Sequence, residues 1–365
     1  MPGKVALKVK RNVLKDLSEN TKVIVVTGTN GKTTSCRILE EGLKKAGKSY
    51  FINKSGANLI TGVTASFIMN STITGKCKKD YAIIECDENA FKEVSRYIHC
   101  DVILVTNVFR DQLDRYGEVT HTLNAIKESV KNLPNAIVCL DADCSLTYSM
   151  SKEIPNKIIT FGVNVPFDKN AKAPEISDAK YCIFCKHEYD YTYHTYGHLG
   201  GFVCPNCGYK RPQPDFAVES VEEMKNDHSV VVANLNGDRN IIRVNIGGAY
   251  NIYNAIGCAA ALTAFGIDEK TVIDAIEHFN GAFGRMEHFK AGDNTVNLIL
   301  VKNPAGFSQT MNFLKNIDDD FTLILSLNDN AADGRDISWI WDVDFAGIFE
   351  KANVKEIYVT GKRCY

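Results

Sequence analysis

Residues 23–34 read Val-Ile-Val-Val-Thr-Gly-Thr-Asn-Gly-Lys-Thr-Thr, and this stretch decides the fold of the chain. Its apolar start is typical of a buried strand, and apolar residues follow it at helical spacing. A strand, a glycine-rich turn and a helix in this order form a loop whose backbone N–H groups and helix dipole bind phosphate. In such a loop Lys32 reaches the terminal phosphates, and the Thr33 hydroxyl binds Mg²⁺. The sequence therefore predicts a nucleoside triphosphate site.

The expected phosphate contacts all fall in this loop. Val26 occupies the position of the first glycine in the general phosphate-loop pattern, so the match is not perfect. A glycine-rich turn without a ligand is the alternative, but a lysine and two threonines exceed what a turn requires. The residues expected to bind the nucleotide here are Thr29, Asn30, Gly31, Lys32, Thr33 and Thr34, and Lys32 is also expected to be catalytic.

The composition is that of a globular enzyme. The chain has 365 residues, of which 45% are apolar, so two or three domains with real cores are expected. A net charge of -2 argues against a bulk electrostatic interaction with nucleic acid. No apolar run approaches the ~20 residues that span a bilayer, and the basic N-terminal residues do not resemble a signal peptide. We therefore expect a cytoplasmic protein without a transmembrane segment.

Four of the twelve cysteines form two Cys-x-x-Cys pairs that are separated by 18 residues. This spacing is typical of a zinc site with four thiolate ligands, here Cys182, Cys185, Cys204 and Cys207. A redox role or a coincidence is the alternative interpretation. A site with four protein ligands has no open position for substrate, so the zinc is expected to be structural. The other eight cysteines are expected to be small buried apolar residues.

Strand-like and helix-like patterns alternate along most of the chain, as in βαβ units that build a parallel sheet. We expect an α/β fold with a parallel-sheet, P-loop-type ATPase domain over residues 1–284. The zinc ribbon is an insertion in it at residues 178–212. Residues 281–293 are rich in glycine and are expected to be a hinge. A smaller Rossmann-like α/β domain, expected to be truncated, follows at residues 285–365.

Polar side chains gather where two predicted strands end, the edge at which open α/β sheets bind ligands. Glu85, Asp87 and Glu88 follow the strand at residues 81–84. A carboxylate one strand away from a phosphate loop is a usual Mg²⁺ ligand, so Glu85 is expected to bind Mg²⁺ together with Thr33. Acidic residues of a solvated loop are the alternative, especially for Asp87 and Glu88.

Several motifs resemble those of the Mur ligase superfamily and occur in the same order. They are the phosphate loop itself, the run from Thr106-Asn107 to Asp111, Asp114 and Gly117, Asn251-x-x-Asn254-Ala255, and Gly284-Arg285-Met286-Glu287. The four-cysteine insertion and the segments at residues 302–306 and 326–336 are similar to a branch of synthetase subunits that amidate lipid II. The resemblance covers nearly the whole chain.

The resemblance implies that ATP phosphorylates the α-carboxylate of D-glutamate in the lipid II stem peptide, and that ammonia then displaces phosphate to give D-isoglutamine. It implies that Asn254, with Asn251, reads the adenine edge and that Arg285 contacts the γ-phosphate across the hinge. Closure of the C-terminal domain would then exclude water from the acyl phosphate. The cofactors implied are ATP, Mg²⁺ and structural Zn²⁺.

Some positions depart from the wider superfamily. Gln112 stands where many members have a histidine that binds a second Mg²⁺. Its amide oxygen can still offer a ligand, so the sequence leaves a second metal open. Lys127 falls where some members have a carbamoylated lysine, but an ordinary surface lysine is the expected interpretation. The ribose motif is absent because Ile299 and Lys302 replace its acid and its histidine. Because the phosphate loop starts near residue 27, the nucleotide-sugar domain of full members is not expected, which suits a lipid-linked substrate at the inner face of the bacterial membrane.

The ammonia is expected to come from another chain. A class I glutaminase needs a cysteine on a tight turn and a partner histidine, and no cysteine here has that context. The resemblance implies a separate GatD-like glutaminase subunit, whose Cys–His pair Asp336 would complete as a catalytic residue. The alternative for Asp336 is a helix cap.

The sequence leaves three alternative functions. A GTPase-like switch lacks the guanine motif, and a zinc-ribbon nucleic-acid module is disfavoured by the acidic net charge. The third is a folylpolyglutamate-synthetase-like ligase or another Mur-type ligase that adds an amino acid instead of ammonia. Its soluble substrate would stimulate ATP hydrolysis without any glutaminase partner.

Overall fold

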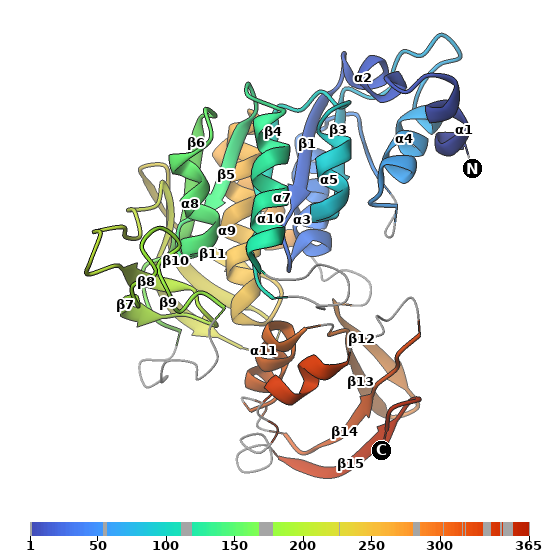
Figure 1. The fold of residues 1–365 in the computed structure, drawn as a ribbon. Coiled ribbons are helices and arrows are strands. Elements are labelled where there is room, and N and C mark those ends of the chain that lie inside the picture. Colours follow the sequence, from blue (N-terminus) through green and yellow to red (C-terminus); the bar gives the residue numbers. More distant parts are fainter. Residues whose placement is uncertain are drawn as a thin grey trace.

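The computed structural model describes residues 2–53, 57–110, 119–167, 178–225, 227–279, 285–301, 303–315, 317, 319–330, 337–343, 345 and 353–364. Its centre is a nine-stranded sheet with the order β11-β10-β9-β6-β5-β4-β1-β3-β2 (Figure 1). The strands are β1 (Lys22–Thr27), β2 (Tyr50–Ile52), β3 (Tyr81–Glu85), β4 (Val102–Val105), β5 (Ile137–Asp141), β6 (Ile158–Val163), β9 (Phe216–Met224), β10 (Ser229–Leu235) and β11 (Asp238–Val244).

The strands from β2 to β9 are parallel, and β9, β10 and β11 form an antiparallel extension. The predicted large parallel sheet is therefore confirmed, as are the strand before the phosphate loop and the strand at residues 81–84. Residues 236–237 form the hairpin turn between β10 and β11.

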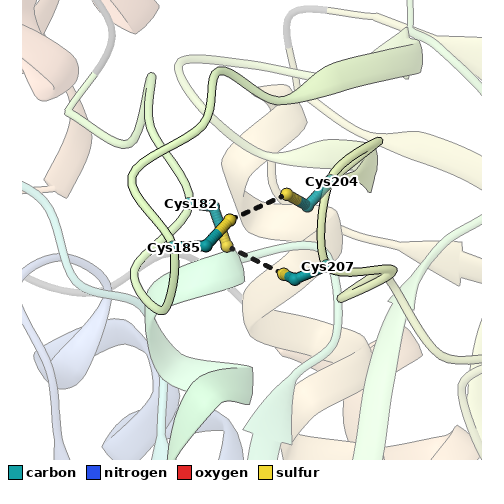
Figure 2. A group of neighbouring side chains, drawn as sticks. All are labelled: Cys182, Cys185, Cys204 and Cys207. Atoms are coloured by element: carbon teal, nitrogen blue, oxygen red, sulfur yellow. Dashed lines mark hydrogen bonds between the residues drawn. The ribbon is translucent and has the colours of Figure 1, made fainter.

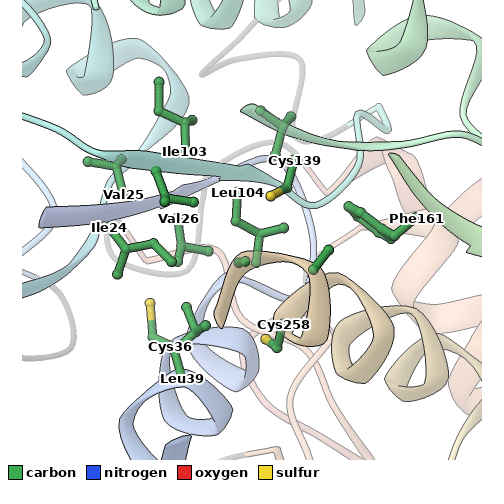
Figure 3. Close-up of a cluster of buried hydrophobic side chains, with 14 of the residues drawn as sticks. Ile24, Val25, Val26, Cys36, Leu39, Ile103, Leu104, Cys139, Phe161 and Cys258 are labelled. Carbon is green, nitrogen blue, oxygen red and sulfur yellow. The ribbon is translucent and has the colours of Figure 1, made fainter. Parts of the chain in front are cut away.

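Helices cover both faces of this sheet (Figure 1). Helices α3 (Lys32–Lys45), α9 (Ala249–Ala264) and α10 (Glu269–His278) pack against one another on one face, while α5 (Glu88–Val94) and α7 (Val119–Lys131) pair on the other. The core lies between strands such as β1 and β4 and the inner sides of α3 and α9 (Figure 3). It includes Cys36, Cys139 and Cys258, so these cysteines behave as small apolar residues as expected.

A lobe at the β2 end consists of α1 (Pro2–Val9), α2 (Val13–Ser18) and α4 (Ile60–Met69). Two short helices, α8 (Ser145–Ser149) and η1 (Met150–Lys152), follow β5. The cysteine-rich insertion lies between β6 and β9, which are neighbours in the sheet, and it contains the antiparallel pair β7 (Asp190–His194) and β8 (Gly200–Val203).

The C-terminal part has its own small core around Phe307, Met311 and Trp339. It contains β12 (Arg285–Ala291), β13 (Asn294–Ile299), α11 (Pro304–Lys315), β14 (Phe321–Ser326), η2 (Ser338–Asp342) and β15 (Val354–Thr360). The expected hinge at residues 281–293 is corrected here, because residues 285–291 pair with β13 in a hairpin that turns at Gly292. Residues 280–284, with the predicted domain boundary, lie outside the described residues.

Candidate active site

The phosphate loop joins the end of β1 to the start of α3, at the edge where the parallel strands end. Gly31 has a φ of 86°, and a Cβ atom there would lie 2.1 Å from Asn254 Oδ1, so both the conformation and the space require glycine. The loop is fixed from β4, because Thr29 N donates to the Asn107 carbonyl and Asn30 N to Asn107 Oδ1. The first turn of α3, with Thr33 and Thr34, thus presents its N–H groups beside the loop.

Lys32 is held inside this loop and is 91% buried. Its ammonium group donates to the carbonyl oxygens of Gly28 and Thr29 and forms an ion pair with Glu88 Oε1 at 2.8 Å. Glu88 begins α5 and is itself buried, so it is not a solvated loop acid. Sequence reasoning missed this partner, although its position at a helix start beside the predicted magnesium ligand was a signal.

Two oxygen-bearing side chains meet next to Lys32. Thr33 Oγ1 donates to Glu85 Oε1 at 3.2 Å, which brings together the two predicted Mg²⁺ ligands. Asn53 fixes the end of β3, since its side chain accepts from Glu85 N and donates to the Glu85 carbonyl. Hydroxyl and carboxylate oxygens are the ligands that Mg²⁺ prefers, so the donor set fits this ion. Asp87 instead caps α5 by accepting from Asn89 N and Ala90 N.

The two asparagines of α9, Asn251 and Asn254, lie next to the phosphate loop at Gly31. Asn254 Nδ2 donates to Asn251 Oδ1 at 2.9 Å, and Asn251 Nδ2 donates to the Gly247 carbonyl. Both side chains are buried, and Asn254 touches Gly31. Their expected contact with adenine stays a prediction.

The C-terminal part reaches the loop through Asn303, a residue that the site prediction did not include. Asn303 is fully buried, its Nδ2 donates to Asn30 Oδ1 at 2.9 Å, and its Oδ1 accepts from Gly306 N at the start of α11. Arg110 adds a second connection, with its guanidinium 2.8 Å from Asp342. The phosphate loop therefore lies between the two parts of the molecule.

Several predicted site residues cannot be placed. The backbone of Arg285 begins β12, but its side chain lies outside the described residues, as do Asp336, Lys302 and the run at 111–117 with Gln112. Lys127 pairs with Glu153 at 2.9 Å, and 16% of its side chain is exposed.

The four predicted zinc ligands converge from two loops, one before β7 and one after β8 (Figure 2). Cys182 Sγ lies 3.6 Å from Cys207 Sγ, Cys185 Sγ lies 3.4 Å from Cys204 Sγ, and all four sulfur atoms are within 4.8 Å of one another. Zn–S bonds of about 2.3 Å in a tetrahedron put the sulfur atoms about 3.8 Å apart, so the cluster fits zinc.

The local chemistry favours the thiolate form of one of the four cysteines, Cys185. Hydrogen bonds from the Asn206 side chain and the His187 backbone lower the pKa of Cys185 to about 6. The thiolate is the form of cysteine that binds metal. Tyr209 of the same insertion packs with Phe202 beside the cysteines.

The insertion is attached to the phosphate loop through Phe109. Phe109 stacks on Tyr196 at 5.7 Å and packs against His198 at 4.5 Å, both of which belong to the insertion. Its backbone N–H donates to Thr29 Oγ1, and the Thr29 hydroxyl donates to the Phe109 carbonyl. Burial lowers the pKa of His198 to about 4, so the imidazole is neutral in this packing. One buried ring thus joins the cysteine-rich insertion to a residue expected to bind nucleotide.

A second attachment is polar. Asp143, which follows β5, pairs through Oδ1 with the guanidinium of Arg211 at the end of the insertion, and Tyr253 of α9 donates to Asp143 Oδ2. Burial raises the pKa of Asp143, and the Arg211 charge opposes that shift. Tyr253 neighbours Asn254, so this network also leads to the loop.

Among the described residues, no helix combines the length and the apolar character needed to span a bilayer.

Comparison with known families gives two matches. Residues 26–199 match the family model of the Mur ligase middle domain, and residues 300–365 match that of the MurT ligase C-terminal domain. Among curated proteins, the chain is 36% identical to the lipid II isoglutaminyl synthase (glutamine-hydrolyzing) subunit MurT of Streptococcus pneumoniae, over 100% of this chain and 79% of that protein. It is 33% identical to the MurT subunit of Staphylococcus aureus, over 100% of this chain and 80% of that protein.

Solved structures share the fold at lower identity. MurF from Acinetobacter baumannii matches with a TM-score of 0.70 and 15% identity, over 98% of this chain and 71% of that one. A pseudomurein peptide ligase type C from Methanothermus fervidus matches with a TM-score of 0.69 and 22% identity, over 93% and 67%. Folylpolyglutamate synthase from Mycobacterium tuberculosis matches with a TM-score of 0.58 and 13% identity, over 89% and 72%.

Proposed function

Since this chain belongs to the MurT branch of the Mur ligase family, we propose that it is the synthetase subunit that amidates lipid II with the energy of ATP. The observation that carries the proposal is the similarity to MurT subunits over the whole chain. The phosphate loop, with its buried Lys32, agrees with it. The amino-acid-adding alternative is less supported: the chain is 26% identical to a UDP-N-acetylmuramoyl-L-alanyl-D-glutamate--2,6-diaminopimelate ligase over 74% of its length, and 13% identical to a folylpolyglutamate synthase of similar fold.

The reaction has two transfers. The α-carboxylate of D-glutamate in the stem peptide attacks the γ-phosphorus of ATP, and ADP leaves. Ammonia then attacks the acyl carbon, phosphate leaves, and the nitrogen loses a proton to give D-isoglutamine. Both steps need charge stabilisation on the phosphoryl group more than acid–base chemistry.

The residues at the end of β1 and β3 suit that need. The N–H groups of residues 30–33 and the Lys32 ammonium would bind the β- and γ-phosphates. Thr33 and Glu85 would hold Mg²⁺, which supplies further positive charge when bound. Asn254, with Asn251, is proposed to read the adenine edge, and Arg285 to contact the γ-phosphate.

Lys32 must change partners for this to occur. In the structure its charge is matched by Glu88, and both side chains are at least 90% buried. A phosphate that enters the loop replaces the carboxylate as the partner of the ammonium group. Glu88 therefore keeps Lys32 charged, paired and aimed into the loop before the nucleotide arrives.

The C-terminal part is proposed to close the site from the opposite side, as a Rossmann-like unit over residues 285–365. The bond between Asn303 and Asn30 supports this, because it ties the start of α11 to the phosphate loop itself. A closed site protects an acyl phosphate from water.

The remaining components are also proposals. Ammonia would come from a GatD-like class I glutaminase subunit, whose Cys–His pair Asp336 would complete. Cys258 cannot serve as the glutaminase nucleophile, because it is fully buried in α9 and burial raises its pKa. Zinc at the four cysteines would be structural. Lipid II would be met at the inner face of the bacterial membrane.

The test is amidation of purified lipid II with ATP, Mg²⁺ and ammonium chloride, read by mass spectrometry. We expect the small mass decrease that replacement of a hydroxyl by an amino group causes. Lys32→Ala should abolish the product, whereas Lys152→Ala, which removes an exposed lysine, should not. If neither ammonia nor an added glutaminase yields product, and folate with glutamate stimulates ATP hydrolysis instead, the amidation proposal is wrong.

A further inference from the structure

A small helical lobe lies at the β2 end of the sheet and is here called the N-terminal lobe (residues 2–20 and 59–80). It comprises α1, α2, α4 and the turn after α4 (Figure 1). Gly3 lies so close to α4 that a Cβ atom would be 2.0 Å from the Thr61 carbonyl oxygen, and Gly75 of the turn lies beside Leu17 of α2. The lobe is therefore one packed unit.

The N-terminal lobe is strongly basic in a chain that carries a net negative charge. Of its three acidic residues, Asp16 pairs with Lys10, while Glu19 and Asp80 line a common hollow with His99 at the base of the lobe. The Lys and Arg residues are eight in number: Lys4, Lys8, Lys10, Arg11, Lys15, Lys76, Lys78 and Lys79. All except Lys79 are exposed.

Large apolar side chains project from the same lobe. In α1, Gly3 packs against α4 and Ala6 and Leu7 are half-buried, whereas Lys4, Val5, Lys8 and Val9 are exposed. Val9 is 84% exposed and Met69 is 68% exposed, and Ile73 at the tip of the turn is fully exposed. Single exposed apolar residues are ordinary, but here they alternate with lysines on one unit.

We propose that the N-terminal lobe docks on an anionic lipid surface. Lysines attract lipid headgroups of negative charge, and the valines, Met69 and Ile73 enter the boundary between headgroups and acyl chains. A folded protein partner would need an acidic group opposite each exposed basic group of the lobe, whereas an anionic leaflet supplies negative charge over the whole contact.

The position of the lobe suits a lipid-linked acceptor, and in this respect the inference rests on the proposed function. Helix α4 begins one residue after Leu59, and the carbonyl of the preceding Asn58 accepts hydrogen bonds from Cys86 and Asp87. Those residues directly follow the proposed magnesium ligand Glu85. The chain that leads into α4 thus lies beside the residues that follow the proposed magnesium ligand.

The test uses the full chain and sedimentation with vesicles that contain no lipid II. Binding to vesicles of phosphatidylcholine with about 30% anionic phosphatidylglycerol is compared with binding to pure phosphatidylcholine vesicles, at low and at high salt. Lys4→Gln with Lys8→Gln should weaken binding to the anionic vesicles about thirtyfold. The matched control is Lys152→Gln with Lys157→Gln, which removes two exposed lysines elsewhere and should change binding little.

A second arm separates docking from catalysis. The Lys4→Gln, Lys8→Gln variant should amidate a short-chain, water-soluble lipid II analogue at the wild-type rate but show a raised KM for lipid II in vesicles. Equal binding of the wild type to neutral and anionic vesicles, or equal loss in both double variants, overturns the proposal. The proposal is also overturned if the Lys4→Gln, Lys8→Gln variant loses binding to the glutaminase subunit but keeps its binding to anionic vesicles. Absence of amidation on both substrates, with vesicle binding intact, would refute the proposed function alone.

Discussion

Replacement of Gly197 by alanine should disturb the phosphate loop indirectly, because Gly197 packs against the Phe109 ring and Phe109 is hydrogen-bonded to Thr29 of the loop. Gly197 has a φ of 53°, and a Cβ atom there would lie 2.7 Å from Phe109 Cε1. The left-handed conformation costs an alanine about 1 kcal/mol, and crowding a packed core costs about 1–3 kcal/mol more. The free energy of unfolding should therefore fall by about 2–4 kcal/mol.

The same shift should reach the nucleotide. Phe109 cannot move away from residue 197 without straining its two hydrogen bonds to Thr29. Loss of one such bond is worth about 1 kcal/mol, so the Kd of a non-hydrolysable ATP analogue should rise about fivefold. Calorimetric titration measures this Kd, and denaturant unfolding measures the stability change.

Gly47→Ala is the matched control, since Gly47 has a φ of 64° but nothing within 4 Å of the added Cβ. It should cost only the backbone term of about 1 kcal/mol and leave nucleotide affinity unchanged. If the Gly197→Ala variant matches this control in both stability and affinity, Phe109 does not transmit strain between the insertion and the loop.

Three further perturbations test other contacts. Glu88→Gln leaves the buried Lys32 ammonium without its carboxylate, so the nucleotide-free form should be destabilised by about 1–3 kcal/mol. The rise in unfolding temperature caused by ATP and Mg²⁺ should then exceed that of the wild type. Equal rises in the two proteins would contradict this prediction. Burial lowers the pKa of His198 from 6.5 to about 4, so the unfolded chain binds a proton first and stability should fall by roughly 3 kcal/mol between pH 6.5 and pH 4. His198→Asn should flatten that part of the pH–stability curve, and an unchanged curve would assign the loss to other groups. Cys204→Ser should abolish bound zinc in native mass spectrometry and lower the unfolding temperature, whereas a wild-type chain without zinc would disprove the metal site.

Features with a local cause were predictable from the sequence. Val23 to Val26 are all fully buried, as a continuous apolar run between a polar start and a glycine turn indicates. The four cysteines converge because each Cys-x-x-Cys pair is a tight turn by itself, and only the meeting of two turns depends on the fold. Thr33 and Glu85 meet because parallel strands end at one edge.

Features that depend on distant packing were not predictable. The sequence places Glu88 at a helix start near Glu85, but which cation its carboxylate meets depends on the packing of α5 against the phosphate loop. Asn303 meets Asn30 across 273 positions. The predicted hinge was wrong over residues 285–291 for another reason. Gly292 is a hairpin turn residue, and its neighbours were read as a loose linker although apolar residues recur on both sides of it.

The place of the insertion between β6 and β9 also bears on the order of folding. These two strands pair in parallel, so the sheet cannot extend to β10 and β11 until a crossover of some fifty residues has closed. A metal bridge between Cys182 and Cys207 would remove about half of that chain from the closure, which lowers its entropy cost by about 0.6 kcal/mol. The rate at which one side of the sheet assembles would then depend on when the metal arrives during synthesis.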